Sequence, residues 1–204
     1  MKNKIIGLVI CAILFIYFLG GVIYTFVLDK PNKENIKEIK SSNTIKGYEY
    51  LLYDDDLEIY KSEFNILKKN LESKEIDYEE YAKSISKMFL IKLYSLDNIN
   101  NKYDIKGTEF IYPDAIENFK LNITNTLNKY IVDNSDGKRK QDLPIVKNVE
   151  SNSIDEMKFK IGEKEYDAFK INLIIDYIED LGYDKKAELI IVRSDKNLYI
   201  VEKN

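Results

Sequence analysis

An uninterrupted apolar run near the N-terminus is the feature that most constrains this chain. Residues 5–28 read IIGLVICAILFIYFLGGVIYTFVL and contain no charged side chain. As a helix at about 1.5 Å per residue, the run would be roughly 36 Å long, enough to cross a hydrocarbon core of about 30 Å. Lys2 and Lys4 precede it, and basic residues beside a membrane helix favour the cytoplasmic side. The sequence therefore predicts a single-pass membrane anchor over residues 1–28, with a short cytoplasmic N-terminus and the rest of the chain outside.

Two alternatives to an uncleaved anchor involve processing of the N-terminus. A signal peptide has an apolar region of about 7–15 residues that ends in a small-x-small cleavage site. The run here is longer, and the residues around Gly20 and Gly21 lack such a site. A lipoprotein would be modified at Cys11, but Ile10 stands before it where a small residue is needed. The length of the run and the missing cleavage site favour the uncleaved anchor.

The chain after the anchor divides into a linker and one domain. Residues 29–46, DKPNKENIKEIKSSNTIK, mix charged residues, one proline and two serines with three isolated isoleucines. This composition is typical of a polar linker. Residues 47–204 remain, which is an ordinary length for a single domain with its own hydrophobic core. We expect this domain to lie outside the cytoplasm.

Charge and composition exclude several classes of function. The chain has 31 basic and 35 acidic residues and a formal net charge of −4, so it lacks the basic footprint of a nucleic-acid-binding protein. It has no histidine, and its only cysteine is Cys11, inside the predicted anchor. Histidine-based catalysis, Ser-His-Asp triads, histidine-containing zinc sites and cysteine nucleophiles in the domain are therefore excluded. We expect no cofactor and no metal site, and a non-enzymatic role is favoured.

The sequence Asp-x-x-Glu occurs three times before an apolar period of about 3.6 residues. An Asp at a helix N-cap accepts hydrogen bonds from free backbone N–H groups, and a Glu three residues later can bond back to the cap. Asp55, Asp77 and Asp114 hold this position in turn. The spacing predicts three helices, the first with an apolar stripe through residues 60–71 and the third extending to Ile131.

Strand patterns dominate the second half of the chain. Residues 108–112 have the β-prone composition of one short strand. Apolar and polar residues alternate over 157–161 and again over 166–178. Residues 187–194 and 197–203 read as a closing hairpin, and 144–151 as a further edge strand that begins at a proline.

This order predicts an α+β fold in which three helices pack on a curved antiparallel sheet of about four to five strands. The order resembles the nuclear transport factor two-like fold, a cystatin-like cone. The anchored arrangement is similar to that of periplasmic assembly factors of type IV secretion and conjugation systems. The stretch FIYPDAIENFKLNITNTLNKYIVDN, residues 110–134, resembles a segment of uncharacterised membrane-anchored proteins of low-GC Gram-positive bacteria. These resemblances imply a fold that hosts enzymes, binders and scaffolds alike, and they transfer no catalytic residue.

Two clusters of acidic residues invite a calcium interpretation. Asp54, Asp55, Asp56 and Glu58 could supply clustered carboxylates, but a capped helix start that matches the helix dipole explains them as well and is favoured. The loop 133–142 does not match an EF-hand, because aligning its glycine puts Val132 and Leu143 at the first and last ligand positions.

The candidate ligand-binding residues are Tyr94, Tyr112 and Asp176. In a pocket at the mouth of the cone, Asp176 could act as an acid–base carboxylate with either tyrosine as donor. The favoured alternative places Asp176 on the solvent face of its strand, beside Lys170.

Two functions are compatible with these observations. The favoured one is a non-enzymatic scaffold of the cell envelope that recruits a protein partner, in keeping with the assembly factors it resembles. The alternative is a domain with a pocket in the cone, acting as a small-ligand sensor or as an enzyme that uses carboxylate and tyrosine chemistry. An enclosed pocket with convergent polar groups would favour the ligand, and a filled interior with an exposed apolar patch would favour the partner.

Overall fold

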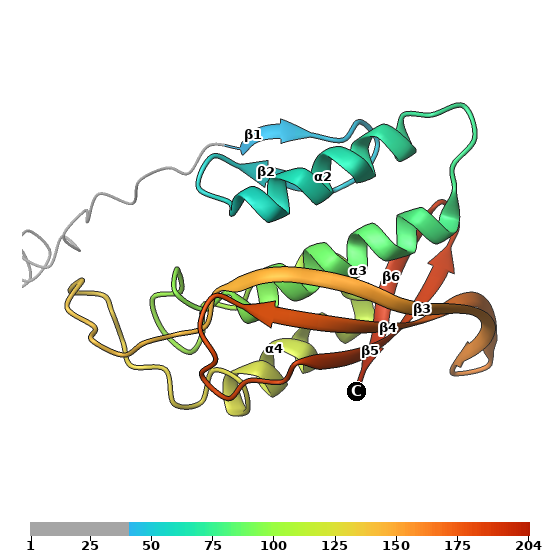
Figure 1. Cartoon of the computed structure of the whole chain (residues 1–204). Coiled ribbons are helices and arrows are strands. Elements are labelled where there is room, and N and C mark those ends of the chain that lie inside the picture. The colour runs from blue at the N-terminus through green and yellow to red at the C-terminus, as the bar shows by residue number, and fades with distance from the viewer. Residues whose placement is uncertain (1–40) are drawn as a thin grey trace, which may run out of the picture. The chain divides into compact units, whose positions relative to one another are not determined.

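Figure 1 shows the computed structural model, which describes residues 41–204. The predicted anchor and most of the predicted linker lie outside the described residues. Within residues 41–204, none of the helices has the length and hydrophobicity needed to span a membrane.

The described residues form an α+β fold, as predicted. It has three α-helices, a four-stranded antiparallel sheet and a separate two-stranded sheet. The elements follow in the order β1 (Ser41–Thr44), β2 (Leu51–Tyr53), α2 (Glu58–Leu71), α3 (Tyr78–Tyr94), the 3-10 helices η1 (Thr108–Phe110) and η2 (Pro113–Ala115), α4 (Ile116–Asn125), β3 (Val146–Ile161), β4 (Lys164–Tyr177), β5 (Lys186–Ser194) and β6 (Asn197–Lys203).

The large sheet has the strand order β3-β4-β5-β6, with every neighbouring pair antiparallel. The two segments predicted separately over 144–151 and 157–161 form one continuous strand, β3, of 16 residues. Its pairing with β4 shifts by one residue near Lys147 and again near Asn152. Each bulge moves the following side chains to the other face, which is why no single alternation runs through the whole strand.

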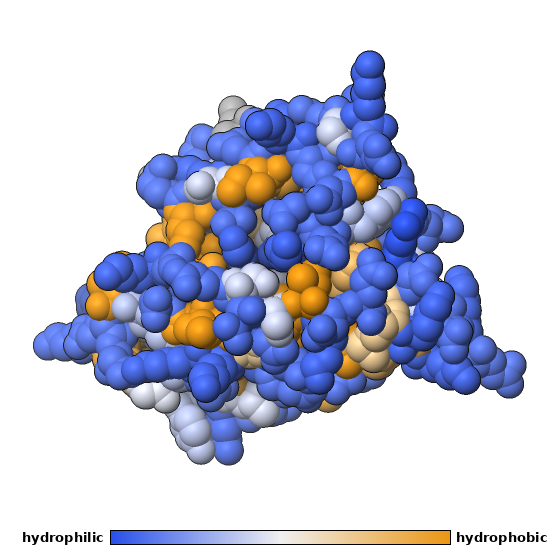
Figure 2. Space-filling model, turned by 45° about the vertical axis from the view of Figure 1, so that its right-hand side comes forward, coloured by the Kyte–Doolittle hydropathy of each residue, from blue (hydrophilic) through white to orange (hydrophobic). Residues whose placement is uncertain are grey.

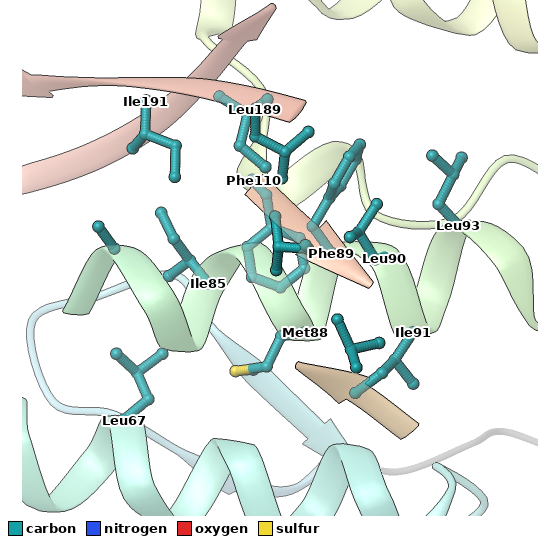
Figure 3. Close-up of a cluster of buried hydrophobic side chains, with 14 of the residues drawn as sticks. Leu67, Ile85, Met88, Phe89, Leu90, Ile91, Leu93, Phe110, Leu189 and Ile191 are labelled. Carbon is teal, nitrogen blue, oxygen red and sulfur yellow. The ribbon is translucent and has the colours of Figure 1, made fainter. Parts of the chain in front are cut away.

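Helix α3 lies between the large sheet and α2 (Figure 1). Eleven of its 17 residues are buried, which fits a helix covered on more than one side. Figure 3 shows Met88 and Ile91 directed toward α2, whereas Leu189 and Ile191 of the sheet lie on the opposite side of α3. The prediction of helices packed on a curved antiparallel sheet is therefore confirmed for α3, while α2 packs on α3 instead.

The three predicted helix starts have different outcomes. Asp77 is the N-cap of α3, and its Oδ1 accepts a hydrogen bond from the Glu80 N–H at 3.0 Å, as predicted. The prediction for Asp55 is wrong, because α2 has Leu57 at its N-cap and no side-chain cap. The neighbouring Asp56 accepts the Tyr53 N–H at 2.8 Å and so closes the turn before the helix.

The third helix start is also displaced. Asp114 lies inside η2, and α4 begins at Ile116 without a side-chain cap. Pro113 has the fixed φ that suits the first residue of a helical turn, and it opens η2. Asp114 is therefore already inside a helical turn and is not in the position of an N-cap. Helix α4 ends at Asn125 rather than continuing to Ile131.

The short strand predicted over 108–112 is wrong for most of its length. Residues Thr108–Phe110 form η1, and only Ile111 makes a bridge, parallel to Ile200 of β6. Gly107 adopts a left-handed φ of 82°, and Pro113 cannot donate a backbone hydrogen bond. The extended stretch between these two residues is too short for a strand.

The end of the predicted linker belongs to the folded domain. Ser41–Thr44 form β1, which pairs antiparallel with β2. The next residue, Ile45, is only 1% exposed and joins the main hydrophobic cluster.

Replacing Asp77 with alanine should lower the free energy of unfolding by about 1 kcal/mol, because the N-terminal N–H groups of α3 lose their cap. The matched Asp55→Ala variant should unfold with the same midpoint as the parent, since Asp55 caps no helix. Urea titrations of both variants, followed by far-UV circular dichroism, measure the difference. Equal losses in the two variants would contradict the assigned caps.

Candidate functional site

A cleft with a volume of about 530 Å³ lies between α3, α4 and the outer edge of β6. This volume is within the range of about 300–1,000 Å³ that is common for ligand sites. Residues from all three elements line it, together with the loop residue Asp184.

The floor of the cleft is apolar. Phe89 and Leu93, one turn apart on α3, supply part of it, and Ile200 of β6 supplies another part. Phe119 and Ile123, also one turn apart, come from α4. The rings of Phe89 and Phe119 have centroids 5.9 Å apart, which joins α4 to the main hydrophobic cluster. A ligand on this floor would bury apolar surface.

Polar groups gather at one end of the cleft. Tyr94, at the C-terminus of α3, donates a long hydrogen bond of 3.5 Å from its hydroxyl to Asp184 Oδ2. Lys203 Nζ lies 5.5 Å from the centroid of the Tyr94 ring. The Tyr177 hydroxyl donates to the Asp184 backbone oxygen at 2.8 Å and fixes this loop residue. A phenol, a carboxylate and an ammonium group thus meet at the same place.

A β-bulge explains why a lysine on β6 points into the cleft. Ile191 pairs with Ile200, but Ile190 pairs with Glu202, so Val201 is an extra residue in β6. The bulge places Lys203 opposite Leu189, whose side chain lies in the hydrophobic core. Cross-strand partners share a face, so Lys203 lies on the inner face of the sheet.

The electrostatics at this end of the cleft keep the Tyr94 side chain a neutral phenol. Burial raises the pKa of Tyr94 above that of an ordinary tyrosine, and the nearby Lys203 opposes this effect. Tyr94 therefore keeps its proton at neutral pH and is a hydrogen-bond donor. Asp184 and Lys203 are charged and reach solvent, so the site pairs a mixed polar rim with an apolar floor.

Of the three residues predicted for a pocket, only Tyr94 lines the cleft. The Tyr112 hydroxyl lies 3.1 Å from the Tyr166 hydroxyl, and the Tyr112 ring packs edge-on against Tyr166 and Tyr199 in a separate cluster. Asp176 is exposed on β4, on the face opposite Ile175 and the core. The three do not form one site, and the position of Asp176 agrees with the solvent-face alternative.

Asp184 and Lys203 were not predicted, and their sequence context explains why. Asp184 lies in the connection between β4 and β5, among other charged residues. Lys203 belongs to a strand whose alternation predicts an outward side chain if the bulge is not known. No local pattern distinguishes either residue from the surface charges around it.

The acidic cluster at residues 54–58 does not form a metal site. Within residues 41–204, no group of three or more His, Cys, Asp or Glu side chains is arranged to hold a metal ion. Asp56 Oδ1 instead lies 3.6 Å from Lys92 Nζ. The calcium alternative therefore gains no support from the described residues, and the capped-helix alternative is wrong in its choice of Asp55.

The surface shows no single dominant apolar patch on the face drawn in Figure 2, where several separate hydrophobic areas lie among hydrophilic side chains. Large apolar side chains that are exposed elsewhere in the sequence are Ile66, Tyr103, Leu121, Tyr130, Val132, Ile174 and Ile178. The cleft brings its lining residues together in one place, whereas these exposed side chains come from several separate elements and loops.

Comparison with protein-family models, with curated proteins and with solved structures finds no match to this chain.

Proposed function

We propose that this chain is a non-enzymatic interaction protein of the cell envelope, held at the outer side of a membrane by residues 5–28. In this proposal the cleft between α4 and β6 receives an apolar segment of a protein partner. The observation that carries it is that the cleft is open to solvent rather than an enclosed pocket, with an apolar floor and three polar side chains at one end. The domain would be of the nuclear transport factor two-like type and would act in assembling an envelope machine, such as a conjugation or secretion system.

The chemistry of the cleft supports binding more than catalysis. Phe89, Leu93 and Ile200 are each at most 2% exposed, so the floor is held rigidly by the core. A rigid apolar floor stabilises a bound apolar group by removing its surface from water. Tyr94 has a raised pKa, so at neutral pH it stays a phenol that donates a hydrogen bond, and little phenolate is present to act as a base.

A small amphipathic ligand is the second candidate. The volume of about 530 Å³ would accommodate a small molecule, and the Tyr94 hydroxyl, Asp184 and Lys203 would hold its polar end. The two candidates differ in what occupies the cleft in cells.

Site-specific photo-crosslinking in the native host would test the occupant. A photoreactive amino acid at Asn118, which is exposed and lines the cleft, is expected to give one discrete protein adduct. The matched control is Glu117, the adjacent exposed residue, which does not line the cleft and should give no such adduct. Equal adducts from both positions would contradict the cleft as the binding site. A small molecule that copurifies with the intact protein, without a protein adduct, would favour the second candidate.

Labelling of intact host cells would test the proposed membrane anchor and the outward-facing domain. In a Cys11→Ser background, Tyr130→Cys places the only cysteine at a residue that is 77% exposed. A membrane-impermeant thiol reagent should label this variant in intact cells. Labelling only after lysis would contradict an outward-facing domain, whatever occupies the cleft.

A further inference from the structure

The outer edge of β3 is long and open. Strand β3 spans Val146–Ile161 at one end of the sheet order, and within residues 41–204 it pairs only with β4. Figure 1 shows it as the long orange strand. At 16 residues it is much longer than the usual strand of about 5–6 residues. An open edge of this length is a template for pairing with another strand.

The register with β4 shows which backbone groups face outward. The hairpin closes at the pair Ile161 and Lys164, across a turn in which Gly162 has a φ of 60°. In an antiparallel pair, alternate residues direct their N–H and C=O groups toward the partner strand and away from it. The outward groups near the hairpin therefore belong to the even-numbered residues from Ile154 to Lys160.

Charged residues on an edge normally oppose pairing with another chain. On β3, however, their order is acidic and then basic, because Asp155 and Glu156 precede Lys158 and Lys160. When such a segment pairs antiparallel with a copy of itself, acidic residues come to lie opposite basic ones. Opposite charges directly across two strands stabilise the pair, whereas like charges destabilise it.

Only some registers keep this complementarity. A two-fold axis at Met157 places Glu156 opposite Lys158 of the partner subunit, and Lys158 opposite the partner's Glu156. An axis at Glu156 or at Lys158 would instead place that residue opposite its own copy, with like charges facing each other. Residues on both sides of the Met157 axis have outward backbone groups in matching positions, so the hydrogen bonds of an antiparallel ladder can form.

We propose that two copies of this chain pair antiparallel through the outer edges of β3, on a two-fold axis at Met157. The two large sheets then form one continuous sheet across the dimer. The contact is isologous, since each copy uses the same segment. This proposal rests on the edge and its charges, and it does not depend on the occupant of the cleft.

Disulfide trapping would test the axis. In a Cys11→Ser background, Met157→Cys places two cysteines at a pair without mutual hydrogen bonds, where the Cα atoms are about 4.5 Å apart. This separation is within the range of about 4.4–6.8 Å that a disulfide spans. Mild oxidation of the full chain in detergent should therefore give a cross-linked dimer. The control Ile161→Cys, on the same face, would place the Cα atoms roughly 27 Å apart at about 3.4 Å per residue, and should give at least tenfold less.

A charge exchange gives a second, independent test. Glu156→Lys and Lys158→Glu should each weaken the dimer at least tenfold in sedimentation experiments, because each puts like charges opposite across the dimer. An equimolar mixture of the two variants should restore it, since every facing pair is then opposite in charge. Lys158→Glu also breaks the ion pair of Lys158 with Asp167 of β4, so restoration of the dimer in the mixture is the result that assigns its effect to the dimer contact. Glu179→Lys, an exposed residue outside β3, makes the same charge change as Glu156→Lys and should have no effect.

Three outcomes with the purified protein would overturn the proposal. They are the absence of trapping at residue 157, equal trapping at residues 157 and 161, and a mixture that dimerises no better than the single variants. A protein adduct at residue 118 in the same preparation would leave the proposed function intact, so the two failures are distinguishable. A different protein captured by residue 157 in cells would show that the edge serves another partner and would also overturn pairing between copies.

Discussion

Replacing Phe89 with alanine is expected to lower the free energy of unfolding by about 3–5 kcal/mol, the usual cost of removing a buried phenylalanine from a core. The side chain is fully buried on α3 and contacts two other rings. Its centroid lies 6.3 Å from that of Phe110 and 5.9 Å from that of Phe119. A Cβ at Gly107 would come within 3.1 Å of the ring, so the backbone itself is fitted to this side chain. The surrounding residues can therefore relax only a little into the cavity that Phe89→Ala would leave.

Urea unfolding of the full chain in detergent, followed by far-UV circular dichroism, would measure this loss. The control is Leu121→Ala on α4, where the side chain is 64% exposed and the substitution should change stability by less than about 0.5 kcal/mol. A loss below about 1.5 kcal/mol for Phe89→Ala would contradict the described packing of α3 against η1 and α4. Because Phe89 also forms the floor of the cleft, the variant should in addition lose the adduct at residue 118.

Lys92→Met is expected to have the second largest effect, a loss of about 2–3 kcal/mol at neutral pH. Lys92 Nζ lies 3.6 Å from Asp56 Oδ1 and 3.3 Å from Glu109 Oε1, and 4.4 Å from the centroid of the Tyr60 ring. The three charged side chains are only 13–25% exposed. Removing one member of a buried ion pair leaves the other charge uncompensated, and the partial exposure here reduces that cost. Lys61→Met, which breaks an exposed contact with Glu58, is the control and should leave stability nearly unchanged.

The loss caused by Lys92→Met should depend on pH. Burial raises the pKa of Asp56, whereas the Tyr53 N–H and Lys92 lower it. Without Lys92 this pKa should rise further. A pKa that is higher in the folded state means that the fold favours the protonated carboxyl, so the variant gains stability relative to the parent as pH falls. Unfolding titrations at about pH 7 and about pH 4.5 should show the difference between variant and parent shrinking, and a constant difference would contradict the assigned contacts.

The sequence predicts local structure correctly at positions where a single local pattern is present and no neighbouring residue competes with it. The predictions of the cap at Asp77 and of the hairpin formed by residues 187–194 and 197–203 are confirmed, because each depends on a few adjacent residues. The predictions that helices start at Asp55 and Asp114 are wrong, because in each case another local feature determines where the helix begins. Asp56 closes a turn before α2, and Pro113 opens a 3-10 turn before α4.

The candidate site was predicted only in part. Tyr94 was named from its helix, but the cleft depends on where α4 lies beside β6, and no periodic pattern carries that information. Lys203 reaches the cleft because of one extra residue in β6. A bulge of one residue reverses the face of every side chain after it, and it has no clear sequence signature here.

Periodicity and composition are properties of the chain alone, and they were sufficient to predict the α+β class, the antiparallel strands and the absence of histidine and cysteine chemistry in the domain. The prediction of a membrane anchor over residues 5–28 lies outside the described residues and stays a prediction. Three features follow from the fold and from no local pattern: α3 is covered on two sides, Asp176 faces solvent, and Tyr94, Asp184 and Lys203 meet at one end of a cleft. These results depend on contacts between residues far apart in sequence, which local patterns do not encode.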